Sequence, residues 1–573
     1  MNFRWSIAPP QQPQAEQLAQ ELGVSELLAQ CLINRGHSEA EEARRFLKPR
    51  LRDLALPLEI PNMETAIQRL LKARETGEKV VIFGDYDVDG VTSTALLVEV
   101  LEEFGWNINS YLPHRMNEGY GLSRTAVENC LSRFAPSVFL AVDCGSTAGE
   151  TIDFLNEKGL DVIVLDHHQI SDPAPKAVAL VNPQINGGLF CELCSVGLAF
   201  KLAHAIVMEC RKRNDPPSAQ DYDLKPLMDL VALGTVADLV PLVRENRILV
   251  TAGLSRLNQT RRAGLLALME VAQVRDQIGV FEISFQLGPR INASGRLEDA
   301  MASLDLLLCS DVDSAKQQAL ELDACNRERQ QIEKGIADNA IATVRQEFDP
   351  AEDFVIVQGS LDWHVGVVGI VASRVLREFY RPTIILGGEG NELRGSGRSV
   401  EGFDLAEALR ECDDLLTRHG GHAMAAGLSI PPENLPDFRQ RINEFAKKTL
   451  TQEILKPIVK LDAMISLSAM GMEQMEELMS LRPFGAGNVP LQFAVKDVVL
   501  QSLPHRMGKD GQHAKFWVTD GEVSNEVLWW NCGKQALPTG HFDLAFAPQI
   551  NDYNGRRSIQ FKLLNWRPSE QSS

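Results

Sequence analysis

The chain lacks the features of a membrane or secreted protein. No apolar run approaches the roughly 20 residues that a bilayer-spanning helix needs. The N-terminal sequence, MNFRWSIAPPQQPQ, has no continuous apolar core, so we expect no secretory signal peptide. The ten cysteines show no repeating spacing, and the CxxC pair Cys191 and Cys194 has no second pair to complete a zinc site. We therefore expect a cytoplasmic protein with reduced thiols and no membrane partner.

An excess of positive charge is also missing. The chain has 57 Lys and Arg against 77 Asp and Glu, which gives a formal net charge of −20 at pH 7. This balance argues against a protein that coats DNA nonspecifically or lies on a membrane surface. It does not exclude a nucleic-acid enzyme, because bound divalent cations and local basic channels can override the net charge. The sequence contains no GxSxG motif, which would have indicated a serine nucleophile.

Carboxylates gather in residues 80–103, VVIFGDYDVDGVTSTALLVEVLEE. The first four residues are apolar and rich in β-branched side chains, which predicts a short buried strand. Asp85, Asp87 and Asp89 follow at alternate positions and must repel one another unless a cation lies among them. A solvated acidic turn is the simpler alternative. Strand, acidic turn and helix together favour a metal site at a sheet edge.

The sequence after the three aspartates predicts a turn and then a helix. Gly90 permits a sharp turn, and Thr92 or Ser93 can cap the helix. The pattern is similar to a calcium-binding loop, but that loop requires a glutamate where this chain has Leu96. We therefore do not predict a calcium loop.

Two more buried strands end in acids. Asp143 follows the segment VFLAV, and Asp166, His167 and His168 follow the segment DVIVL. Parallel strands joined by helical crossovers end at the same edge of their sheet, where open α/β folds bind ligands. Helix capping can explain one such acid but not three with two histidines beside them. We therefore expect these side chains to converge with the first acidic group.

The ligand types predict the metal. Carboxylates with one imidazole and no thiolate suit Mg²⁺ or Mn²⁺ rather than structural zinc. Two divalent ions about 3.5–4 Å apart would neutralise most of the carboxylate charge, activate water and stabilise both oxygens in an in-line phosphodiester hydrolysis.

The alternation of helices and strands predicts an α/β protein with an added β-barrel. At 573 residues, with 44% hydrophobic and 23% charged residues, the chain should form three or four globular domains. We expect five segments: an N-terminal helical segment at 1–60, a parallel-sheet α/β domain at 61–300, a connecting helix at 301–349, a second α/β domain at 350–450 and an OB-type barrel at 451–568.

Three Gly-rich segments carry basic or histidine side chains. Residues 288–297, GPRINASGRL, are predicted to be irregular. Residues 394–399, RGSGRS, and residues 419–423, HGGHA, are predicted to be loops whose backbone N–H groups are free to meet an anion. Flexible surface loops are the alternative. A long helix is expected over 311–348.

The C-terminal region becomes rich in β-strand patterns. Five apolar or alternating runs occur at 491–500, 513–519, 527–530, 542–549 and 558–566, which predicts a small barrel of the OB type. Residues 501–573 hold 8 Lys and Arg against 7 Asp and Glu, a positive balance in an acidic chain. Its aromatic side chains suit stacking on single-stranded nucleic acid, although many must be core; they are Phe516, Trp517, Trp529, Trp530, Tyr553 and Trp566.

Together these motifs resemble a known family. GDYDVDG, PHRMNEGYG, VDCGS, DHH, GTVADLVPL, PRINASGRL, RGSGRS and GGHAMAAG occur in that order, and LRPFGAGN precedes the β region. The chain is similar over residues 60–565 to the DHH phosphoesterase superfamily, and most closely to its bacterial single-strand-specific 5′→3′ DNA exonucleases. Two departures are small: Ser294 stands where alanine is more usual, and His419 where an aromatic residue is expected.

The resemblance implies a role for each candidate site residue. The implied metal ligands are Asp85, Asp87, Asp89, Asp143, His167 and Asp238, with Asp85 the least secure match. Asp166 and His168 would orient the cluster or contact the phosphate, and Arg296 would contact the scissile or a neighbouring phosphate. The implied phosphate and DNA contacts are Arg115, Tyr120, Ser396, Gly397, Arg398 and His422, of which Arg115, Ser396 and Arg398 resemble a pocket for a 5′-phosphate.

By the same resemblance, the expected function is a two-metal exonuclease in DNA repair and recombination. Its substrate would be single-stranded DNA with a 5′ end, and its expected partners are a single-strand-binding protein and a helicase, with the enzyme itself a monomer. The main alternative is a DHH-type phosphodiesterase that acts on pyrophosphate, cyclic dinucleotides or short oligonucleotides. The barrel argues against that alternative, since a small substrate gains little from an extended binding surface. A non-catalytic DNA-binding scaffold is the other alternative, which the complete set of acids and histidine disfavours.

Overall fold

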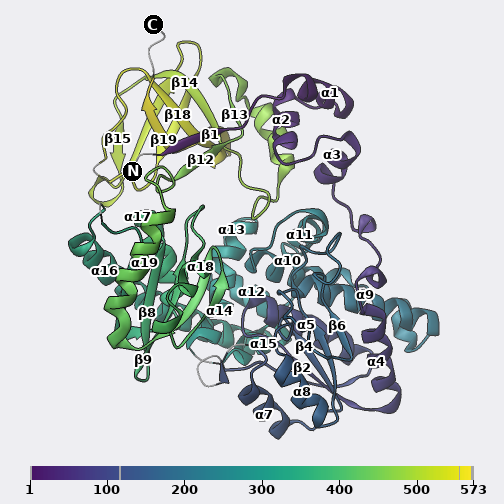
Figure 1. Cartoon of the computed structure of the whole chain (residues 1–573). Coiled ribbons are helices and arrows are strands. Elements are labelled where there is room, and N and C mark those ends of the chain that lie inside the picture. The colour runs from purple at the N-terminus through teal and green to yellow at the C-terminus, as the bar shows by residue number, and fades with distance from the viewer. Residues whose placement is uncertain are drawn as a thin grey trace. The chain divides into compact units, whose positions relative to one another are not determined.

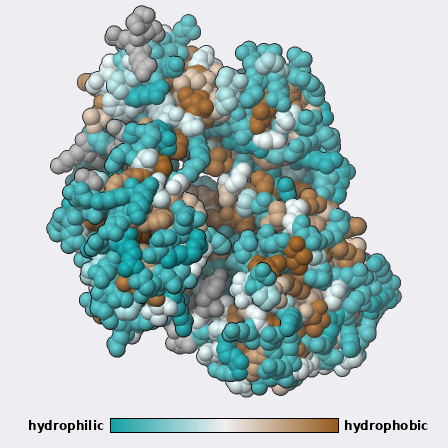
Figure 2. Space-filling model, viewed as in Figure 1, coloured by the Kyte–Doolittle hydropathy of each residue, from teal (hydrophilic) through white to brown (hydrophobic). Residues whose placement is uncertain are grey.

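The strands of the protein form four sheets within the residues that its computed structural model describes, namely 3–114, 118–119, 121–297, 299–350, 352–533, 535–553 and 555–569 (Figure 1). The chain divides into two units. Unit 2 comprises residues 49–338 and 483–488, and unit 1 comprises residues 1–48, 339–482 and 489–573. No helix of the described residues is long and apolar enough to cross a membrane. The face drawn in Figure 2 is mostly hydrophilic, with hydrophobic residues gathered in separate patches.

Unit 2 is built on a five-stranded parallel sheet, as predicted. Its strands are β2 (Lys79–Phe83), β3 (Asn107–Tyr111), β4 (Val138–Val142), β5 (Asp161–Leu165) and β6 (Ala179–Val181), in the order β3-β2-β4-β5-β6. Alternate residues of each strand enter different cores: Val80 and Ile82 belong to one apolar cluster, and Val81 and Phe83 to another. Both faces of the sheet are therefore covered, which explains why the strands are apolar throughout.

Helices surround this sheet and bring further residues to its edge. The helices of unit 2 that concern the site are α5 (Val88–Glu103), α9 (Ser195–Arg213), α10 (Met228–Ala237), α13 (Val280–Glu282), the π-helical segment η5 (Ile283–Leu287) and α14 (Gly288–Leu297). The others are α4 (Met63–Thr76), α7 (Arg124–Arg133), α8 (Gly149–Glu157), α11 (Arg244–Leu257), α12 (Ala263–Val271) and α15 (Met301–Leu308).

The start of α5 differs from the sequence prediction. The helix begins at Val88, before the glycine, and its N-cap is Asp87, whose carboxylate accepts from the Gly90 N–H at 3.1 Å. Thr92 lies inside the helix, and its hydroxyl donates to the Val88 carbonyl at 2.7 Å. Gly90 is needed for close packing rather than for a turn, because a Cβ there would lie 2.7 Å from backbone atoms of Asp85.

The prediction of irregular structure at Gly288–Leu297 was wrong, because this segment forms α14. Its glycines mark points where the helix packs tightly rather than points where it breaks. A Cβ on Gly295 would lie 2.8 Å from the Tyr86 carbonyl oxygen, and one on Gly288 would lie 2.9 Å from the Ile283 carbonyl oxygen. Close approach to the acidic loop therefore outweighs the low helix propensity of glycine.

The long helix predicted over 311–348 is α16 (Val312–Glu347), and the division between the units falls within it. In unit 1 the chain then forms a five-stranded sheet in the order β10-β11-β9-β8-β7. Its strands are β7 (Ile356–His364), β8 (Thr383–Glu389), β9 (Glu392–Arg398), β10 (Arg418–His422) and β11 (Ala425–Ile430), and its helices are α17 (Val368–Phe379), α18 (Leu405–Arg410) and α19 (Leu435–Thr449).

Two predicted loops of unit 1 are strands. RGSGRS lies largely in β9, which pairs with β8 on one side and β11 on the other, so its backbone is used by the sheet. HGGH lies in β10, the edge strand that pairs with β11. The glycines of β9 permit close packing: a Cβ on Gly395 would lie 2.7 Å from the Ile385 carbonyl oxygen. The high glycine content of RGSGRS and HGGH therefore led to the wrong prediction of loops.

The C-terminal region forms a barrel-like sheet, and all five predicted runs contain strands. Its order is β13-β14-β18-β19-β17-β16-β15, with an additional β14–β16 pairing. The strands are β13 (Ala463–Met464), β14 (Phe493–Leu500), β15 (His505–Met507), β16 (His513–Thr519), β17 (Ser524–Trp529), β18 (Phe542–Tyr553) and β19 (Arg556–Pro568).

The N-terminal segment is joined to this region. It contains α1 (Gln12–Leu22), α2 (Glu26–Asn34) and α3 (Ala40–Leu47), as predicted, but also a strand that was not predicted, β1 (Arg4–Ile7), which pairs in parallel with β12 (Ile458–Leu461). The Trp5 indole N–H donates to Asn565 Oδ1 at 2.9 Å, and Arg35 pairs with Asp462 at 2.6 Å. β1 was missed because the strand has only four residues, although these alternate between polar and apolar, and because its partner lies more than 450 positions away.

The packing of Gly90 predicts that substitution will disturb the acidic loop. Gly90→Ala should lower the free energy of unfolding by about 1–3 kcal/mol, because the new methyl group would clash with backbone atoms of Asp85, which cannot move away as a flexible side chain can. Gly335→Ala is the matched control, because Gly335 lies exposed in α16 with no atom within 4 Å of a new Cβ, and it should stabilise by about 0.5–1 kcal/mol. Thermal denaturation compares the two; a Gly90→Ala protein as stable as the wild type would contradict this account of the loop.

Candidate metal centre

The acidic loop after β2 places a buried carboxylate against a helix N-terminus. Asp89 is 1% exposed, and its two carboxylate oxygens accept from the Ser195 N–H at 2.7 Å and the Val196 N–H at 2.8 Å, at the start of α9. Burial and the nearby Asp87 charge raise the Asp89 pKa to about 7, although the two N–H groups favour the charged form. The two hydrogen bonds therefore fix the orientation of the Asp89 carboxylate, but its charged form is poorly stabilised without a bound cation.

Asp143 joins this group from the end of β4. Its backbone has φ of 63°, in the left-handed region that residues other than glycine seldom adopt, and its side chain is 2% exposed. The Ser195 hydroxyl donates to Asp143 Oδ1 at 2.8 Å. Burial, followed by the charges of Asp89, Asp87 and Asp85, raises the Asp143 pKa well above its ordinary value. Strained backbone and clustered acids at one point are typical of a functional site.

His167 lies among three of these carboxylates. Its Nε2 is 3.6 Å from Asp143 Oδ1, 3.6 Å from Asp238 Oδ2 and 3.9 Å from Asp89 Oδ2. Within the described part of the chain, His167 Nε2 and Asp238 Oδ2 are buried and have no hydrogen-bond partner. Ligands that each lie about 2.0–2.2 Å from one ion are themselves about 3–4 Å apart. This spacing fits a shared cation better than direct hydrogen bonds.

The protonation states agree with metal ligation. Burial, with the charge of His168 beside it, lowers the His167 pKa to about 4, so the imidazole is neutral near pH 7 and can offer a lone pair. Burial and the charges of Asp89 and Asp87 raise the pKa of Asp238, at the C-terminal end of α10, to about 9. A divalent cation would reverse the second shift, since it favours the carboxylate form.

The candidate ligand atoms of the described residues form three groups, two of which share Asp143. Within each group the atoms lie within 4.8 Å of one another. The groups are Asp85, Asp87 and Asp143; Asp143, His167 and His168; and Asp89, Cys194 and Asp238. Asp143 belongs to two of them and could bridge two ions. The structure thus brings together all six predicted metal ligands, and their roles as ligands stay a prediction.

Asp166 and His168 form a separate pair beside this cluster. Asp166 is 1% exposed; its Oδ2 accepts from the Ser146 N–H at 2.9 Å, and its Oδ1 lies 2.7 Å from His168 Nδ1. Although burial disfavours both charges, their contact lowers the Asp166 pKa and raises that of His168 to about 9. His168 is therefore favoured as a cation whose Nδ1 is bound to Asp166.

Several supporting residues were not predicted. The structure adds Ser195, Cys194, Ser146, Asn182 and Asn292. The Asn182 amide donates to Ser146 Oγ at 2.8 Å and to the His168 carbonyl at 2.9 Å, and the Val88 N–H donates to Asn292 Oδ1 at 3.1 Å. Ser195 is the first residue of α9, and a serine before an apolar run was a usable signal for a helix start. The others act through long-range contacts, which local patterns do not reveal.

Cys194 is the unexpected member of the cluster. It is fully buried, and its thiol donates to Thr235 Oγ1 at 3.4 Å. Burial and the charges of Asp89 and Asp238 raise its pKa well above the ordinary value, so the sulfur is a neutral thiol in the protein alone. The oxygen and nitrogen donors therefore dominate the site, which suits Mg²⁺ or Mn²⁺.

The structure describes some of the predicted phosphate contacts but not all of them. Arg115 and Tyr120 lie outside the described residues. Arg296 is half-buried on α14, next to Gly295, which packs against Tyr86 of the acidic loop. His422 is exposed at the end of the edge strand β10 of unit 1.

Ser396 and Arg398 form an anion site within unit 1. A Cβ on Gly369, in the first turn of α17, would lie 3.2 Å from both Arg398 Nη2 and Ser396 Oγ, so both groups lie at this helix N-terminus. Arg398 Nη1 donates to Ser396 Oγ at 2.7 Å and to the Gly397 carbonyl at 2.8 Å. Burial lowers the Arg398 pKa, because desolvation disfavours the charged guanidinium. Arginine, hydroxyl and helix N-terminus together favour a phosphate.

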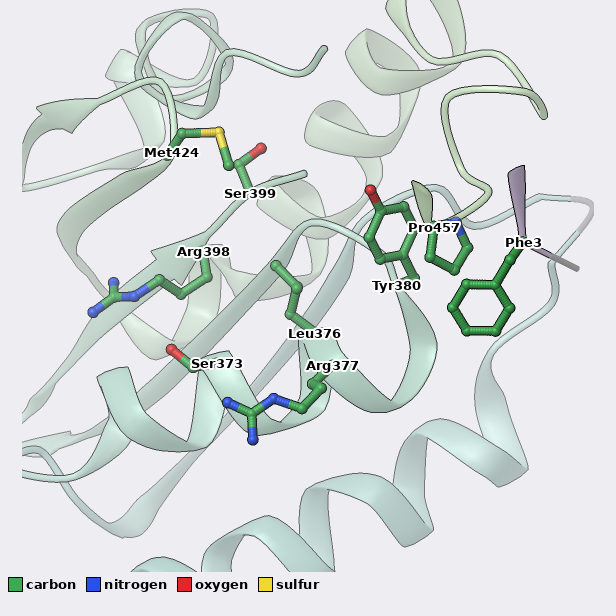
Figure 3. A pocket seen from close by; sticks show the side chains of 9 residues that line it. All are labelled: Phe3, Ser373, Leu376, Arg377, Tyr380, Arg398, Ser399, Met424 and Pro457. Atoms are coloured by element: carbon green, nitrogen blue, oxygen red, sulfur yellow. The ribbon is translucent and has the colours of Figure 1, made fainter. Parts of the chain in front are cut away.

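A cavity of about 550 Å³ adjoins this arginine (Figure 3). Ser373, Arg377 and Tyr380 line it from α17 and the residue after it, and Ser399 and Met424 line it from the strand side. Gly397 has a packing role, since a Cβ there would lie 3.2 Å from Ile384 Cγ1. Ser396 and Arg398 are therefore the residues of RGSGRS that this geometry favours for phosphate binding.

Comparison with known proteins identifies the domains. Residues 79–235 match the DHH family N-terminal domain, residues 352–448 the DHHA1 domain and residues 461–565 the RecJ OB domain. The chain is 36% identical over 580 residues to the single-stranded-DNA-specific exonuclease RecJ of Bacillus subtilis, covering 99% of this chain and 71% of the relative. It is 35% identical over 571 residues to the RecJ of Escherichia coli, covering 95% and 96%.

Solved structures agree with this identification. The structure of Thermus thermophilus RecJ in complex with Mn²⁺ has a TM-score of 0.84 and 30% identity, and it covers 99% of this chain and 80% of that protein. A structure of the same protein with Mg²⁺ has a TM-score of 0.79 and 28% identity, with 99% and 79% coverage. The predicted fold class, an α/β protein with DHH and DHHA1 domains and an OB domain, is confirmed. Both of these RecJ structures hold an ion of the predicted cofactor type, and the clustered acids and histidines of this chain offer ligands that suit such an ion.

The raised carboxyl pKa values predict that metal binding releases protons. Asp89 and Asp238, with pKa values raised to about 7 and about 9, hold protons in the folded metal-free protein that an unfolded chain loses above its carboxyl pKa of about 3.9. The folded state then binds more protons, so the stability of the metal-free protein should fall as pH rises from about 4 to about 9.

Mn²⁺ should displace these protons, so its affinity should rise over the same pH range. Calorimetric titration at pH 7 in two buffers of different ionisation enthalpy measures the release directly, and Asp238→Asn should reduce it. Identical binding enthalpies in both buffers would contradict the raised pKa values of Asp89 and Asp238.

Proposed function

The chain belongs to the RecJ family of single-stranded-DNA-specific exonucleases, and from this premise we propose that it removes nucleotides from the 5′ end of single-stranded DNA with two bound Mg²⁺ or Mn²⁺ ions. It is a metal-dependent nuclease of the DHH type. The observation that carries the proposal is the position of His167 Nε2. It is buried, has no hydrogen-bond partner among the residues that the structure describes, and lies 3.6 Å from carboxylates of two other segments.

The six ligands would hold the ions in two groups. Asp143, which belongs to two of the clusters, is the candidate bridge, with Asp85 and Asp87 on one side and His167, Asp89 and Asp238 on the other. When bound, the ions supply an activated water and stabilise the charge that develops on the oxygens of the scissile phosphate. The protein has no need of a serine or cysteine nucleophile.

Other side chains of the site would orient the substrate and manage its charge. Asp166 fixes the ring of His168 and keeps it protonated, so His168 can donate from Nε2 to a phosphate oxygen. Arg296 would offer a second cation from α14. Ser195 holds Asp143 and Asp89 through its hydroxyl and its N–H, which fixes two ligands from one residue. Asp166 and His168 are thus charge-bearing contacts rather than metal ligands in this proposal.

The direction of degradation would come from recognition of a terminal phosphate. Ser396 and Arg398, at the N-terminus of α17, form the anion site that suits a 5′-phosphate. Arg115, Tyr120, Gly397 and His422 are proposed as further contacts on the resemblance alone. A terminal phosphate carries more negative charge than an internal diester, so an arginine that burial has partly desolvated would favour the end of the strand.

The OB domain would bind the strand away from the scissile bond. On β16, Trp517 is 41% exposed, and Trp530, just after β17, is 44% exposed and packs its ring against His513 at 4.9 Å. Phe516, by contrast, is 1% exposed and belongs to the core. Exposed indole rings on an OB domain suit stacking with unpaired bases.

The cellular setting is proposed on the same basis. We place the enzyme in the cytoplasm, in DNA repair and recombination, where a helicase supplies single strands and a single-strand-binding protein covers them. All ten cysteines are free thiols, in keeping with a reducing compartment. We propose that it acts as a monomer, with domains at 1–60, 61–300, 301–349, 350–450 and 451–568. The alternative activity on short oligonucleotides or cyclic dinucleotides is not favoured, since the RecJ relatives match nearly the whole chain.

A degradation assay tests the proposal directly. Single-stranded and blunt double-stranded oligonucleotides carry a label at the 5′ or the 3′ end and are incubated with Mg²⁺, Mn²⁺ or EDTA. The proposal expects loss of the single strand only, release of a labelled mononucleotide from the 5′ end at once, and no activity in EDTA. Early release of the 3′ label would reverse the polarity, and equal attack on duplex would remove the single-strand specificity.

The anion site predicts a preference for phosphorylated ends. Arg398→Ala should lower kcat/KM on 5′-phosphorylated strands by about 10²-fold, while activity on 5′-hydroxyl strands changes much less. Arg394→Ala is the matched control, since Arg394 also lies on β9 but pairs with Glu389 at 3.1 Å. An equal loss on both kinds of end would assign Arg398 to general backbone binding.

The exposed indoles predict an effect on affinity that depends on strand length. Substituting both Trp517 and Trp530 with alanine should raise KM on long strands by roughly one to two orders of magnitude, because stacking is worth about 1–3 kcal/mol per base. The value of kcat should change little, and di- and trinucleotides should be cleaved as by the wild type. An unchanged KM on long strands would indicate that this surface binds another protein.

A further inference from the structure

Two phenylalanine rings are exposed beside the metal centre in unit 2. Phe281 is 59% exposed and Phe285 is 66% exposed. Their ring centroids lie 5.0 Å apart with an interplanar angle of 36°, so the two side chains form one aromatic surface. Exposed phenylalanine costs solvation free energy and gives nothing to the core. The neighbouring Ile283 and Leu287 are fully buried, and through them this segment packs against the apolar core.

The helical stretch that carries these rings continues along the rim of the metal centre. Phe281 lies in α13, Phe285 in η5, and α14 follows directly. A Cβ on Gly288, three residues after Phe285, would lie 3.5 Å from Ala237 Cβ and 3.8 Å from Val88 Cγ2. Ala237 precedes the predicted ligand Asp238, and Val88 lies between the predicted ligands Asp87 and Asp89. Phe285 is therefore about one helical turn from Gly288, where this helix packs against the neighbours of three predicted ligands.

The same helix contacts the acidic loop further along. The Val88 N–H donates to Asn292 Oδ1 at 3.1 Å, and Gly295 packs on Tyr86. Arg296, the proposed phosphate contact, follows Gly295. One rigid element thus carries an aromatic surface at one end and a cation at the other, with the metal ligands between.

The backbone is unusual within this segment and next to the predicted ligand Asp238. Residues 283–287 form a π-helical segment, a form that is rare and frequent at functional sites. Leu239, which follows Asp238, is 68% exposed and has φ of 62°, a strained conformation for a leucine. A chain that needed only stability would bury these side chains or replace them with polar ones.

From these observations we propose that Phe281 and Phe285 form a stacking platform for the unpaired bases of the DNA strand next to the scissile phosphate. The inference rests on the proposed function, and it names residues that the nuclease motifs do not include. Flat aromatic surface binds every base through its π-face, so it favours a single strand without selecting a sequence. A base paired in a duplex cannot offer that face, and the platform therefore contributes to the discrimination against double-stranded DNA.

Binding measurements with the full-length protein test the platform. A fluorescein-labelled single-stranded oligonucleotide is titrated in EDTA, which prevents cleavage, and anisotropy gives the dissociation constant. Phe285→Ala should weaken binding roughly 5- to 150-fold, the equivalent of the 1–3 kcal/mol typical of one stacked base. Phe285→Trp should stay within about threefold of the wild type. Leu266→Ala, at a 49% exposed apolar residue of α12 away from the platform, is the control and should bind as the wild type does.

Abasic substitutions separate stacking from a structural effect. Moving one abasic site along the oligonucleotide should reveal a position where the wild type loses affinity and where Phe285→Ala loses no more. An equal penalty for Phe285→Ala on intact and abasic strands, or no penalty on either, would overturn the proposal; the second result would leave the rings as a protein-docking surface. If the wild type does not degrade single strands, the proposed function fails. If it does and Phe285→Ala binds normally, only the platform fails.

Discussion

The mutual repulsion of buried carboxylates is the constraint on which the site depends. Asp85, Asp89 and Asp143 are at most 2% exposed. Asp89, Asp143 and Asp238 lie within 3.9 Å of His167 Nε2, and Asp143 also forms a group with Asp85 and Asp87. The raised pKa values of Asp143 and Asp238 show that the protein alone does not stabilise these groups as anions. Such a cluster is unfavourable unless divalent cations compensate it. The surrounding elements are arranged to hold it in spite of that cost.

The residues around the predicted metal ligands share one role, which is to hold the ligands and the acidic loop in place. The N-terminus of α9 clamps Asp89, and the Ser195 hydroxyl clamps Asp143. Gly90 and Gly295 allow backbone to approach the acidic loop closely, and Asn292 ties that loop to α14. Because each ligand is fixed by different segments, the geometry requires the whole sheet and its covering helices. Unit 1 has its own preorganised site, where Ser396 and Arg398 meet the N-terminus of α17.

The sequence predicted the elements that local physics determines. The bounds of β4 and β5 were predicted correctly at both ends because these strands are apolar on both faces. The acids that follow them converge because parallel strands end at one edge of the sheet. The predictions failed where glycine served tertiary packing: α14 and β9 were taken for loops, and Gly90 for a turn. β1 and the contacts of Asn182 and Asn292 depend on partners far along the chain, which one sequence does not reveal.

The most direct test of the central claim is the number of Mn²⁺ ions bound by Asp143→Asn, measured together with its turnover of single-stranded DNA. This substitution keeps the shape of the side chain and an acceptor for the Ser195 hydroxyl, so the fold should survive. If Asp143 bridges two ions, the variant should lose at least one of them and at least about 10³-fold in rate, equivalent to about 4 kcal/mol of barrier. A folded Asp143→Asn protein that binds two Mn²⁺ ions and cleaves at the wild-type rate would contradict the account.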